Sequence, residues 1–345
     1  MLSLTDFATA TASRRRFLCG CTTAGLLGRA WRPAYAATPA SASEEAASIE
    51  MRPVQVADGA WFVQGQAALG SAANQNFISN AGFVVTPAGV VVIDALGSPP
   101  LARRLLAEIA KITPQPVRYV IATHYHADHI YGLQVFSQAG ATVIAHVAAR
   151  EYLASDTARL RLQASRQDLF PWIDETTRLV EPDRWVGVPD AKADTTLELG
   201  GVRFLIRPVG PAHTPEDLVV FLPDRGVLYG GDLLFRGRIP FVGQADSRAW
   251  IAALDRLLAL KPRVLVPGHG AASTEPLADI ALTRDYLQFL RERMGAAARE
   301  LEPFEEAYAR TDWSRFAGLP LFQAANRMNA YNTYLLMEQE PADRP

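Results

Sequence analysis

Cysteine is nearly absent from this chain. Among its 345 residues only Cys19 and Cys21 are cysteines, and both lie close to the N-terminus. We expect both to be removed with a signal peptide over residues 1–36, which leaves neither disulfide nor thiol chemistry in the mature chain. A cysteine nucleophile, a thiolate metal ligand and a disulfide framework are therefore excluded.

The chain also has no excess of positive charge and no long apolar run. Its formal net charge is −2, and residues 1–36 carry five arginines and one aspartate, which leaves −6 for the rest. An acidic protein is a poor match for nucleic-acid phosphates, so we expect no nucleic-acid partner. The apolar segment 17–27 is shorter than the roughly 20 residues that span a bilayer, so we expect no stable membrane anchor.

The N-terminus has the parts of an export signal. Residues 13–18 read SRRRFL, which is similar to a twin-arginine motif. A short apolar segment follows, and Ala34-Tyr35-Ala36 offers a cleavage site before Ala37. The alternative is a disordered tail that carries three arginines. We predict a twin-arginine signal peptide, the twin-arginine export machinery as its partner, and a periplasmic or secreted bacterial protein.

Length and composition predict one sizeable folded unit after this signal. Apolar residues make up 49% of the chain, which supports a large core. Residues 37–50 are rich in alanine, serine and glutamate and predict a flexible spacer. We expect a main domain over 51–300 and a helical C-terminal extension, 301–345, packed on it.

Residues 124–129, HYHADH, are the most informative stretch. They follow an apolar run, 117–122, that predicts a buried strand. Buried histidine and aspartate are costly unless they are paired or bind a metal. Alternation along an extended segment puts His124 and His126 on one side, where they can bind one metal. Asp128 and His129 follow on the turn, where they can reach a second.

Three further residues have the same setting. His213, Asp232 and His269 each follow a strand-like run and lie in a loop marked by glycine or proline. Metal sites are usually built on such loops, which a rigid scaffold holds in place. The remaining histidine, His146, has no ligand pattern around it and is interpreted as structural.

The order HxHxDH, His, Asp, His resembles the metallo-β-lactamase superfamily. The resemblance extends over the scaffold from about Val54 to Ala272, including Asn80 to Thr86 and Val90 to Gly97. It implies an α+β fold, the αββα four-layer sandwich, in which two mixed sheets face each other, helices lie outside and metals bind at one sheet edge. Here we expect C-terminal helices in addition.

The resemblance also implies a role for each candidate ligand. His124, His126 and His213 would bind the first metal, Asp128, His129 and His269 the second, and Asp232 would bridge them. Asp232 in that place is similar to glyoxalase-II-type hydrolases. The whole pattern looks most like exported zinc metallohydrolases found beside periplasmic quinoprotein systems.

These residues predict a metal-dependent hydrolase. Imidazoles and carboxylates suit Zn²⁺, two ions per chain, although iron also accepts them. A hydroxide bridging the metals would cleave a thioester, ester, lactone or β-lactam bond of a small-molecule substrate, and Asp128 would act as the catalytic residue that orients it.

Two other functions remain open at this point. The first is a mononuclear iron enzyme of the persulfide-dioxygenase type, in which His124, His213 and Asp232 would form a facial triad. The second is a non-catalytic accessory protein of a periplasmic quinoprotein system. The complete ligand set argues against the second, because unused buried ligands would be a cost to stability.

Several residues near the motifs have weaker roles. Asp94, at a strand end, is expected either to accept a hydrogen bond from a ligand histidine or to be a plain strand-end cap. Arg236 and Arg238 either bind a substrate carboxylate or lie in a solvated loop. Tyr131 either lines the pocket or packs beneath it. Three aromatic residues form an apolar pocket wall or belong to the core: Trp172, Phe235 and Phe241.

Overall fold

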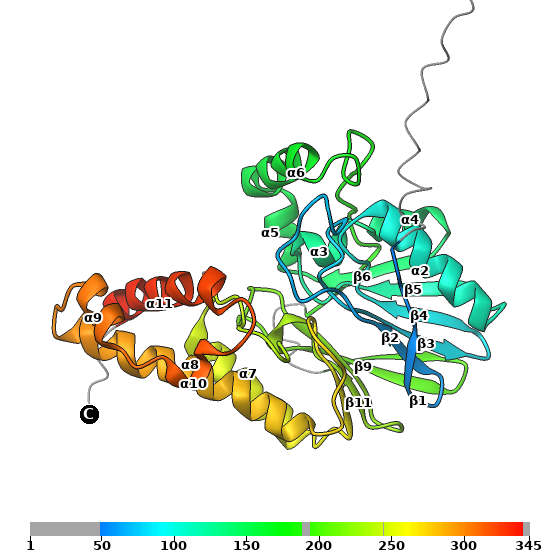
Figure 1. Ribbon diagram of the computed structural model, residues 1–345. Coiled ribbons are helices and arrows are strands. Elements are labelled where there is room, and N and C mark those ends of the chain that lie inside the picture. The colour runs from blue at the N-terminus through cyan, green and yellow to red at the C-terminus, as the bar shows by residue number, and fades with distance from the viewer. Residues whose placement is uncertain (1–48, 188–193, 244, 341–345) are drawn as a thin grey trace, which may run out of the picture. The chain divides into compact units, whose positions relative to one another are not determined.

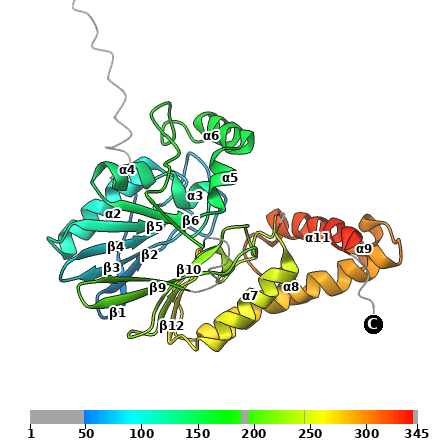
Figure 2. The same cartoon turned by 180° about the vertical axis from the view of Figure 1, so that it is seen from behind.

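A computed structural model describes residues 49–187, 194–243 and 245–340 of the chain. The predicted signal peptide, and the predicted spacer up to residue 48, lie outside the described residues. Unit 40–345 contains two β-sheets packed face to face with helices on their outer faces, as Figures 1 and 2 show from opposite sides. The predicted αββα sandwich with C-terminal helices is confirmed.

The first sheet contains seven strands within the described residues, in sequence order from β1 to β7. Strands β1 to β4 pair antiparallel and β4 to β7 pair parallel. The bounds are β1 Val54–Ala57, β2 Ala60–Val63, β3 Ala81–Thr86, β4 Gly89–Ile93, β5 Val117–Ile121, β6 Thr142–His146 and β7 Arg184–Val186.

The second sheet has the order β12-β11-β10-β9-β8 in the part of the chain that is described. Its pairs are antiparallel except for β11 and β12, which run parallel. The bounds are β8 Thr195–Leu199, β9 Val202–Pro208, β10 Leu218–Leu222, β11 Val227–Tyr229 and β12 Val264–Val266.

Helices cover both outer faces. On the first sheet lie α2, which begins with the Ser98 cap and two prolines as expected for a helix start, and the short helices that follow the HYHADH stretch. The second sheet is covered by α7 and the long α8, along which α11 packs. The bounds are α2 Pro99–Ile112, α3 Ala127–Ile130, α4 Leu133–Gln138, α5 Ala149–Leu153, α6 Asp156–Asp168, α7 Ser247–Ala259, α8 Pro276–Arg299, α9 Phe304–Arg310, α10 Ser314–Ala317 and α11 Phe322–Gln339.

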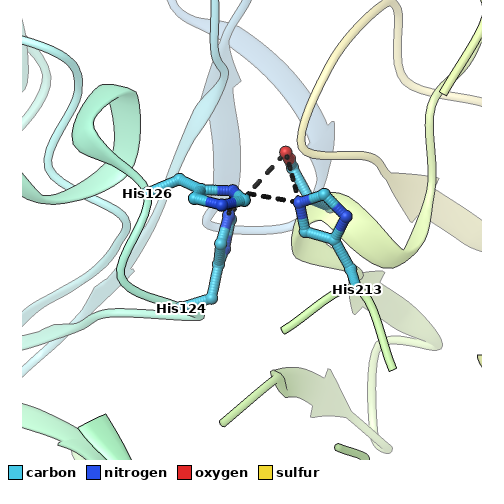
Figure 3. A group of neighbouring side chains, drawn as sticks. His124, His126 and His213 are labelled. Carbon is cyan, nitrogen blue, oxygen red and sulfur yellow. Dashed lines mark hydrogen bonds and ion pairs between the residues drawn. The ribbon is translucent and has the colours of Figure 1, made fainter. Parts of the chain in front are cut away.

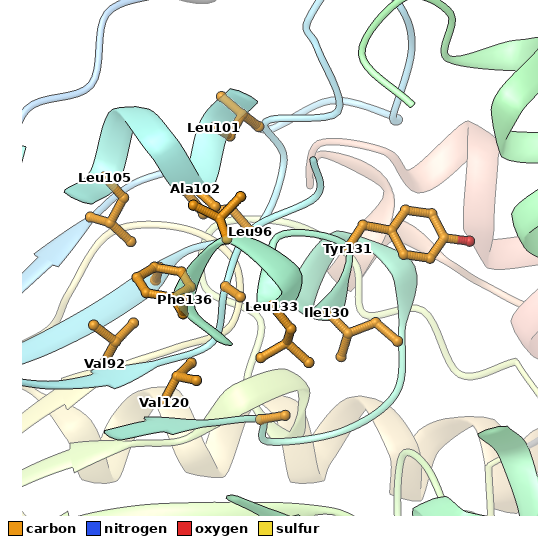
Figure 4. Close-up of a cluster of buried hydrophobic side chains, with 14 of the residues drawn as sticks. Val92, Leu96, Leu101, Ala102, Leu105, Val120, Ile130, Tyr131, Leu133 and Phe136 are labelled. Carbon is orange, nitrogen blue, oxygen red and sulfur yellow. The ribbon is translucent and has the colours of Figure 1, made fainter. Parts of the chain in front are cut away.

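Three apolar clusters hold these layers together. The central cluster joins side chains of both sheets, such as Ile93 from β4 and Phe204 from β9. A second lies between the first sheet and its helices, where Leu105 and Phe136 are buried over Val92 (Figure 4). The third lies under α7, α8 and α11 and includes Trp250. Because layers on both sides are filled, the strand ends are held rigidly.

The C-terminal helix α11 is tied to a loop of the second sheet by a buried asparagine. Asn329 accepts a hydrogen bond from the Val242 amide at 2.9 Å and donates to the Pro240 carbonyl at 2.7 Å and to the Tyr286 hydroxyl at 3.0 Å.

Among the helices of the described residues, none is both long and apolar enough to cross a membrane.

We expect Asn329→Ala to lower the free energy of unfolding by about 2–4 kcal/mol, because it leaves the buried amide of Val242 and carbonyl of Pro240 without partners. Urea unfolding measures the change. Asn332→Ala, one turn further along α11 at a half-buried position, is the matched control and should cost less than about 0.5 kcal/mol. Equal losses for the two variants would contradict the role assigned to Asn329.

Candidate metal centre

The seven candidate ligands come from strand ends that meet at one edge of the sandwich. The HYHADH residues follow β5 of the first sheet, and His213, Asp232 and His269 follow β9, β11 and β12 of the second. The structure brings them together in two groups, in each of which the ligand atoms lie within 4.8 Å of one another. One group contains His124, His126, His213 and Asp232, and the other contains Asp128, His129 and His269.

Three imidazoles converge in the first group (Figure 3). The Nδ1 atom of His126 lies 3.1 Å from Nε2 of His124 and 3.0 Å from Nε2 of His213. Tetrahedral zinc with bonds of about 2.0–2.1 Å would hold its nitrogen ligands roughly 3.3 Å apart. The spacing of these nitrogens therefore suits one ion.

The second group combines a carboxylate and two imidazoles. The Oδ2 atom of Asp128 lies 3.4 Å from Nε2 of His269 and 3.5 Å from Nε2 of His129. His129 is fully buried, whereas the Asp128 side chain keeps 16% of its surface exposed. Asp128 is thus the group member that reaches solvent.

Asp232 lies between the two groups. Its Oδ1 atom is 3.1 Å from Nε2 of His129, and its Oδ2 atom is 3.2 Å from Nε2 of His269. Oδ2 also lies 3.6 Å from Nε2 of His213 and 3.7 Å from Nε2 of His124. One buried carboxylate therefore faces four imidazoles, two from each group.

Glycines make room for this carboxylate. A Cβ atom at Gly268 would lie 2.0 Å from Oδ1 of Asp232, closer than any side chain can approach. Gly231 adopts a φ of +51°, and a Cβ there would lie 2.8 Å from Oγ1 of Thr123. The glycines that precede Asp232 and His269 in the sequence are thus needed for the two ligands to meet.

Asp94 orients one histidine of each group. Its Oδ1 atom accepts a hydrogen bond from the Thr123 amide at 2.8 Å, and its Oδ2 atom accepts from the Thr123 hydroxyl and from Nδ1 of His129, each at 2.9 Å. The Thr123 hydroxyl, having donated its proton, can only accept from Nδ1 of His124, 3.0 Å away. These bonds place a proton on Nδ1 of each histidine, so that in the neutral form Nε2 carries the lone pair. The predicted hydrogen bond in which Asp94 accepts from a candidate ligand histidine is present.

His269 is oriented by the main chain. Its Nδ1 atom donates to the carbonyl of Ile78 at 2.7 Å, so Nε2 again carries the lone pair.

The backbone of Asp94 is strained. Its φ is 63°, an uncommon value for a residue with a side chain. Such strain is concentrated at functional sites, where the surrounding structure maintains it.

The donor set fits a metal ion. Nε2 of His129 and Oδ1 of Asp232 are buried without a hydrogen-bond partner. Burial lowers the pKa of His124 and His126 well below the usual value and that of His213 to about 4, so these imidazoles are neutral at pH 7. Neutral imidazoles and carboxylates are the ligand forms that metals bind.

The second group is richer in negative charge. Burial lowers the pKa of His129, but the nearby carboxylates of Asp232, Asp128 and Asp94 outweigh it and raise the pKa well above the usual value. Burial raises the pKa of Asp232, and His269 and His129 more than reverse that effect. Several carboxylates this close together favour a bound cation. A metal ion can therefore replace the proton on His129.

A pocket of about 570 Å³ opens beside the first group. His126 and His213 line it together with residues of α6, α11 and the loop between β11 and α7. These residues include Tyr125, Arg161, Phe241 and Met328.

The two arginines that the sequence offered as carboxylate binders, Arg236 and Arg238, have different surroundings in the structure. Arg236 donates to Asp279 of α8 at 2.9 Å and so has a structural partner. Arg238 is buried between the rings of Phe235 and Phe241, with Nη1 3.2 Å from Nδ1 of His269. That Nδ1 carries the proton that it donates to the Ile78 carbonyl. It therefore cannot also accept a hydrogen bond from the guanidinium of Arg238.

Among the aromatic residues considered in the sequence, some lie at the site and others lie in the core. Phe241 lines the pocket, and Phe235 stacks on His269 with ring centroids 5.1 Å apart. Tyr131 is fully buried beneath the site, with its hydroxyl 3.3 Å from Oγ of Ser165. Trp172 donates to the Ala72 carbonyl, and His146 lies outside both groups.

Sequence reasoning missed Ile78, Arg161 and Met328. Ile78 acts through its carbonyl oxygen, which every residue has, so its side chain gives no signal. Arg161 and Met328 reach the pocket from helices that carry no motif. Only the packing of α6 and α11 shows that they belong to it.

Comparison with known proteins now identifies the family. A family model described as the metallo-beta-lactamase superfamily matches residues 75–269, more than half of the chain. The chain belongs to this superfamily. The match begins before β3 and ends at His269, so it includes all seven candidate ligands.

Curated relatives and solved structures agree with this assignment. A linear primary-alkylsulfatase from Pseudomonas sp. (strain ATCC 19151) is 26% identical over 246 residues, which cover 61% of this chain and 45% of the alkylsulfatase. Metallo-beta-lactamase IND-1 from Chryseobacterium indologenes is 24% identical over 200 residues, which cover 56% of this chain and 73% of IND-1. The chain thus spans less than half the length of the alkylsulfatase relative.

Two solved structures share the fold. A metallo-beta-lactamase from Pontibacter korlensis has a TM-score of 0.54 at 24% identity, covering 69% of this chain and 99% of that protein. The sec-alkylsulfatase Pisa1 from Pseudomonas sp. has a TM-score of 0.64 at 20% identity, covering 83% of this chain and 50% of Pisa1. At the level of the family, the family model and the curated relatives confirm the predicted superfamily of metal-dependent hydrolases, and the two solved structures show its fold.

Asp94→Asn should weaken metal binding about 10- to 100-fold, because the single amide oxygen cannot accept all three hydrogen bonds that the two carboxylate oxygens accept and that fix the tautomers of His129 and His124. Competition with a chromophoric chelator measures the affinity, and circular dichroism checks that the fold is retained. An Asp94→Asn protein that is folded and binds metal as tightly as the parent would refute this role.

Proposed function

We propose that the chain is a zinc-dependent hydrolase that binds two metal ions, one at each group of ligands. The observation that carries this proposal is the position of Asp232, whose two carboxylate oxygens face histidines of both groups at 3.1–3.7 Å. His124, His126 and His213 would hold the first ion, Asp128, His129 and His269 the second, and Asp232 would contact both.

The residues of this chain divide the work of catalysis. Zinc ions bound here would supply a water of lowered pKa and a Lewis acid for the bond that breaks. Asp128 is more exposed than Asp232, 16% against 5% of the side chain, so it is the carboxylate that can accept a hydrogen bond from an attacking water and orient it. The pocket lined by His126 and His213 would position the substrate beside the first group of ligands.

The bond cleaved is proposed to be an ester or a related acyl bond, namely a thioester, lactone or β-lactam. Relatives named as an alkylsulfatase and as beta-lactamases support an ester or a cyclic amide. The open pocket of about 570 Å³ supports a small-molecule substrate.

The protein is further proposed to act outside the cytoplasm after export by the twin-arginine machinery. The motif SRRRFL at residues 13–18 and the site Ala34-Tyr35-Ala36 support this. Because this pathway carries folded proteins, it suits an enzyme that acquires its metal before export.

Protein purified without chelator or added metal should contain about two zinc ions per chain, and their removal should abolish hydrolysis of esters, thioesters and lactams. Elemental analysis and turnover measure the two effects. His126→Ala and His269→Ala should each lose about one zinc, because each removes a ligand from one group. The matched control is His146→Ala, a histidine outside both groups, which should keep both ions.

A different metal content, or two zinc ions without activity, would contradict this proposal. About one iron with little zinc, together with oxygen uptake in the presence of a persulfide, would favour the iron enzyme. Two zinc ions without turnover on any of these substrates would favour the non-catalytic accessory protein.

Replacing Arg14 and Arg15 together by lysine should retain the protein in the cytoplasm, because the twin-arginine pair is the recognised element. Immunoblots of periplasmic and cytoplasmic fractions measure the distribution. The paired control replaces Arg29 and Arg32 by lysine in the same segment and should be exported. Undiminished export of the Arg14/Arg15 variant would show that another signal is used.

A further inference from the structure

The pocket beside the first group of histidines is built from elements far apart in the sequence. The helices α6 and α11 lie at the same end of the sandwich (Figures 1 and 2). Arg161 of α6 and Met328 of α11 both line the pocket, together with Phe241 and Val242 from the loop between β11 and α7. One cation and several apolar side chains thus surround the approach to His126 and His213.

Arg161 has no anionic partner in the part of the chain that the structure describes. The neighbouring arginines of α6 are both engaged, because Arg159 donates to Asp156 at 3.1 Å and Arg166 donates to the Thr177 carbonyl at 2.8 Å. Arg161 forms no hydrogen bond or ion pair with any residue that the structure describes.

The one carboxylate among the described residues that line this pocket is already used elsewhere. Asp246 caps α7, where its Oδ1 atom accepts a hydrogen bond from the Ala249 amide at 2.9 Å. A carboxylate at a helix N-terminus is also stabilised by the helix dipole. Arg161 therefore remains available to an anion that enters the pocket.

We infer that Arg161 binds an oxyanion of the substrate, and that Phe241, Val242 and Met328 accept an apolar chain attached to it. The substrate class is then an amphiphile that carries a carboxylate or a sulfate near the bond to be cleaved. This inference rests on the proposed function and names the substrate of the same site.

The chemistry of the lining supports both halves of this substrate. A guanidinium presents paired N–H donors that match the oxygens of a carboxylate or a sulfate. Met328 is 44% exposed, a high value for so apolar a side chain. Methionine is flexible and adapts to irregular apolar partners, which suits an alkyl chain of variable position.

The test compares Arg161→Gln with Arg159→Gln, its neighbour on α6. Binding of decanoate, decyl sulfate and decanol to the zinc-loaded full chain is measured by calorimetry. Arg161→Gln should weaken binding of an anion about fivefold, the scale of an exposed charge pair, and leave decanol unchanged. Arg159→Gln should bind all three as the parent does. Met328→Ala should weaken all three, because it shortens the apolar wall.

Comparison of the two anions distinguishes a carboxylate from a sulfate as the group that Arg161 binds. A loss confined to decanoate identifies a carboxylate, a loss confined to decyl sulfate identifies a sulfate, and a loss of both supports the shared chemistry. Equal binding of both anions by Arg161→Gln and Arg159→Gln would overturn the inference. Decanoate and decanol carry no bond that the proposed enzyme would cleave, so a protein that binds decanoate through Arg161 but hydrolyses nothing would instead count against the proposed function.

Discussion

The buried carboxylate of Asp232 is the constraint on which this site depends. A negative charge with no access to water must be compensated, and four imidazoles of two groups lie within 3.7 Å of its oxygens. These histidines come from both sheets, so the compensation exists only when the sandwich is assembled. The glycines at 231 and 268 serve the same end, because a side chain at either would collide with this arrangement.

Around this carboxylate, the positions of the ligands follow from the scaffold. The strands β5, β11 and β12 end at the same edge, and the buried clusters on both sides of each sheet keep these ends from moving. A second layer of hydrogen bonds, which Asp94 and the Ile78 carbonyl accept, then fixes which nitrogen of His129 and of His269 faces inward. Geometry and protonation state are thus determined by different parts of the fold, the first by packing and the second by hydrogen bonds.

The sequence was sufficient for the fold and for the residues that meet at the centre. Each of these residues follows an apolar run, and the run is what places it at a strand end. Residues whose surroundings come from distant elements were not predictable in this way. Arg236 and Arg238 are two positions apart, yet one pairs with Asp279 of α8 and the other lies buried against His269. Nothing local distinguishes them, because the partners of each are chosen by how α8 and the loops pack.

The hydrogen bonds of Asp94 connect the two groups of candidate ligands. One carboxylate contacts His129 of the second group directly and His124 of the first through the Thr123 hydroxyl. An ion that draws electron density from one of these histidines strengthens its hydrogen bond and changes the charge that Asp94 offers to the other. If the two ions proposed above bind here, their sites are thermodynamically linked through Asp94, and because linkage is reciprocal each ion would change the affinity for the other by the same factor.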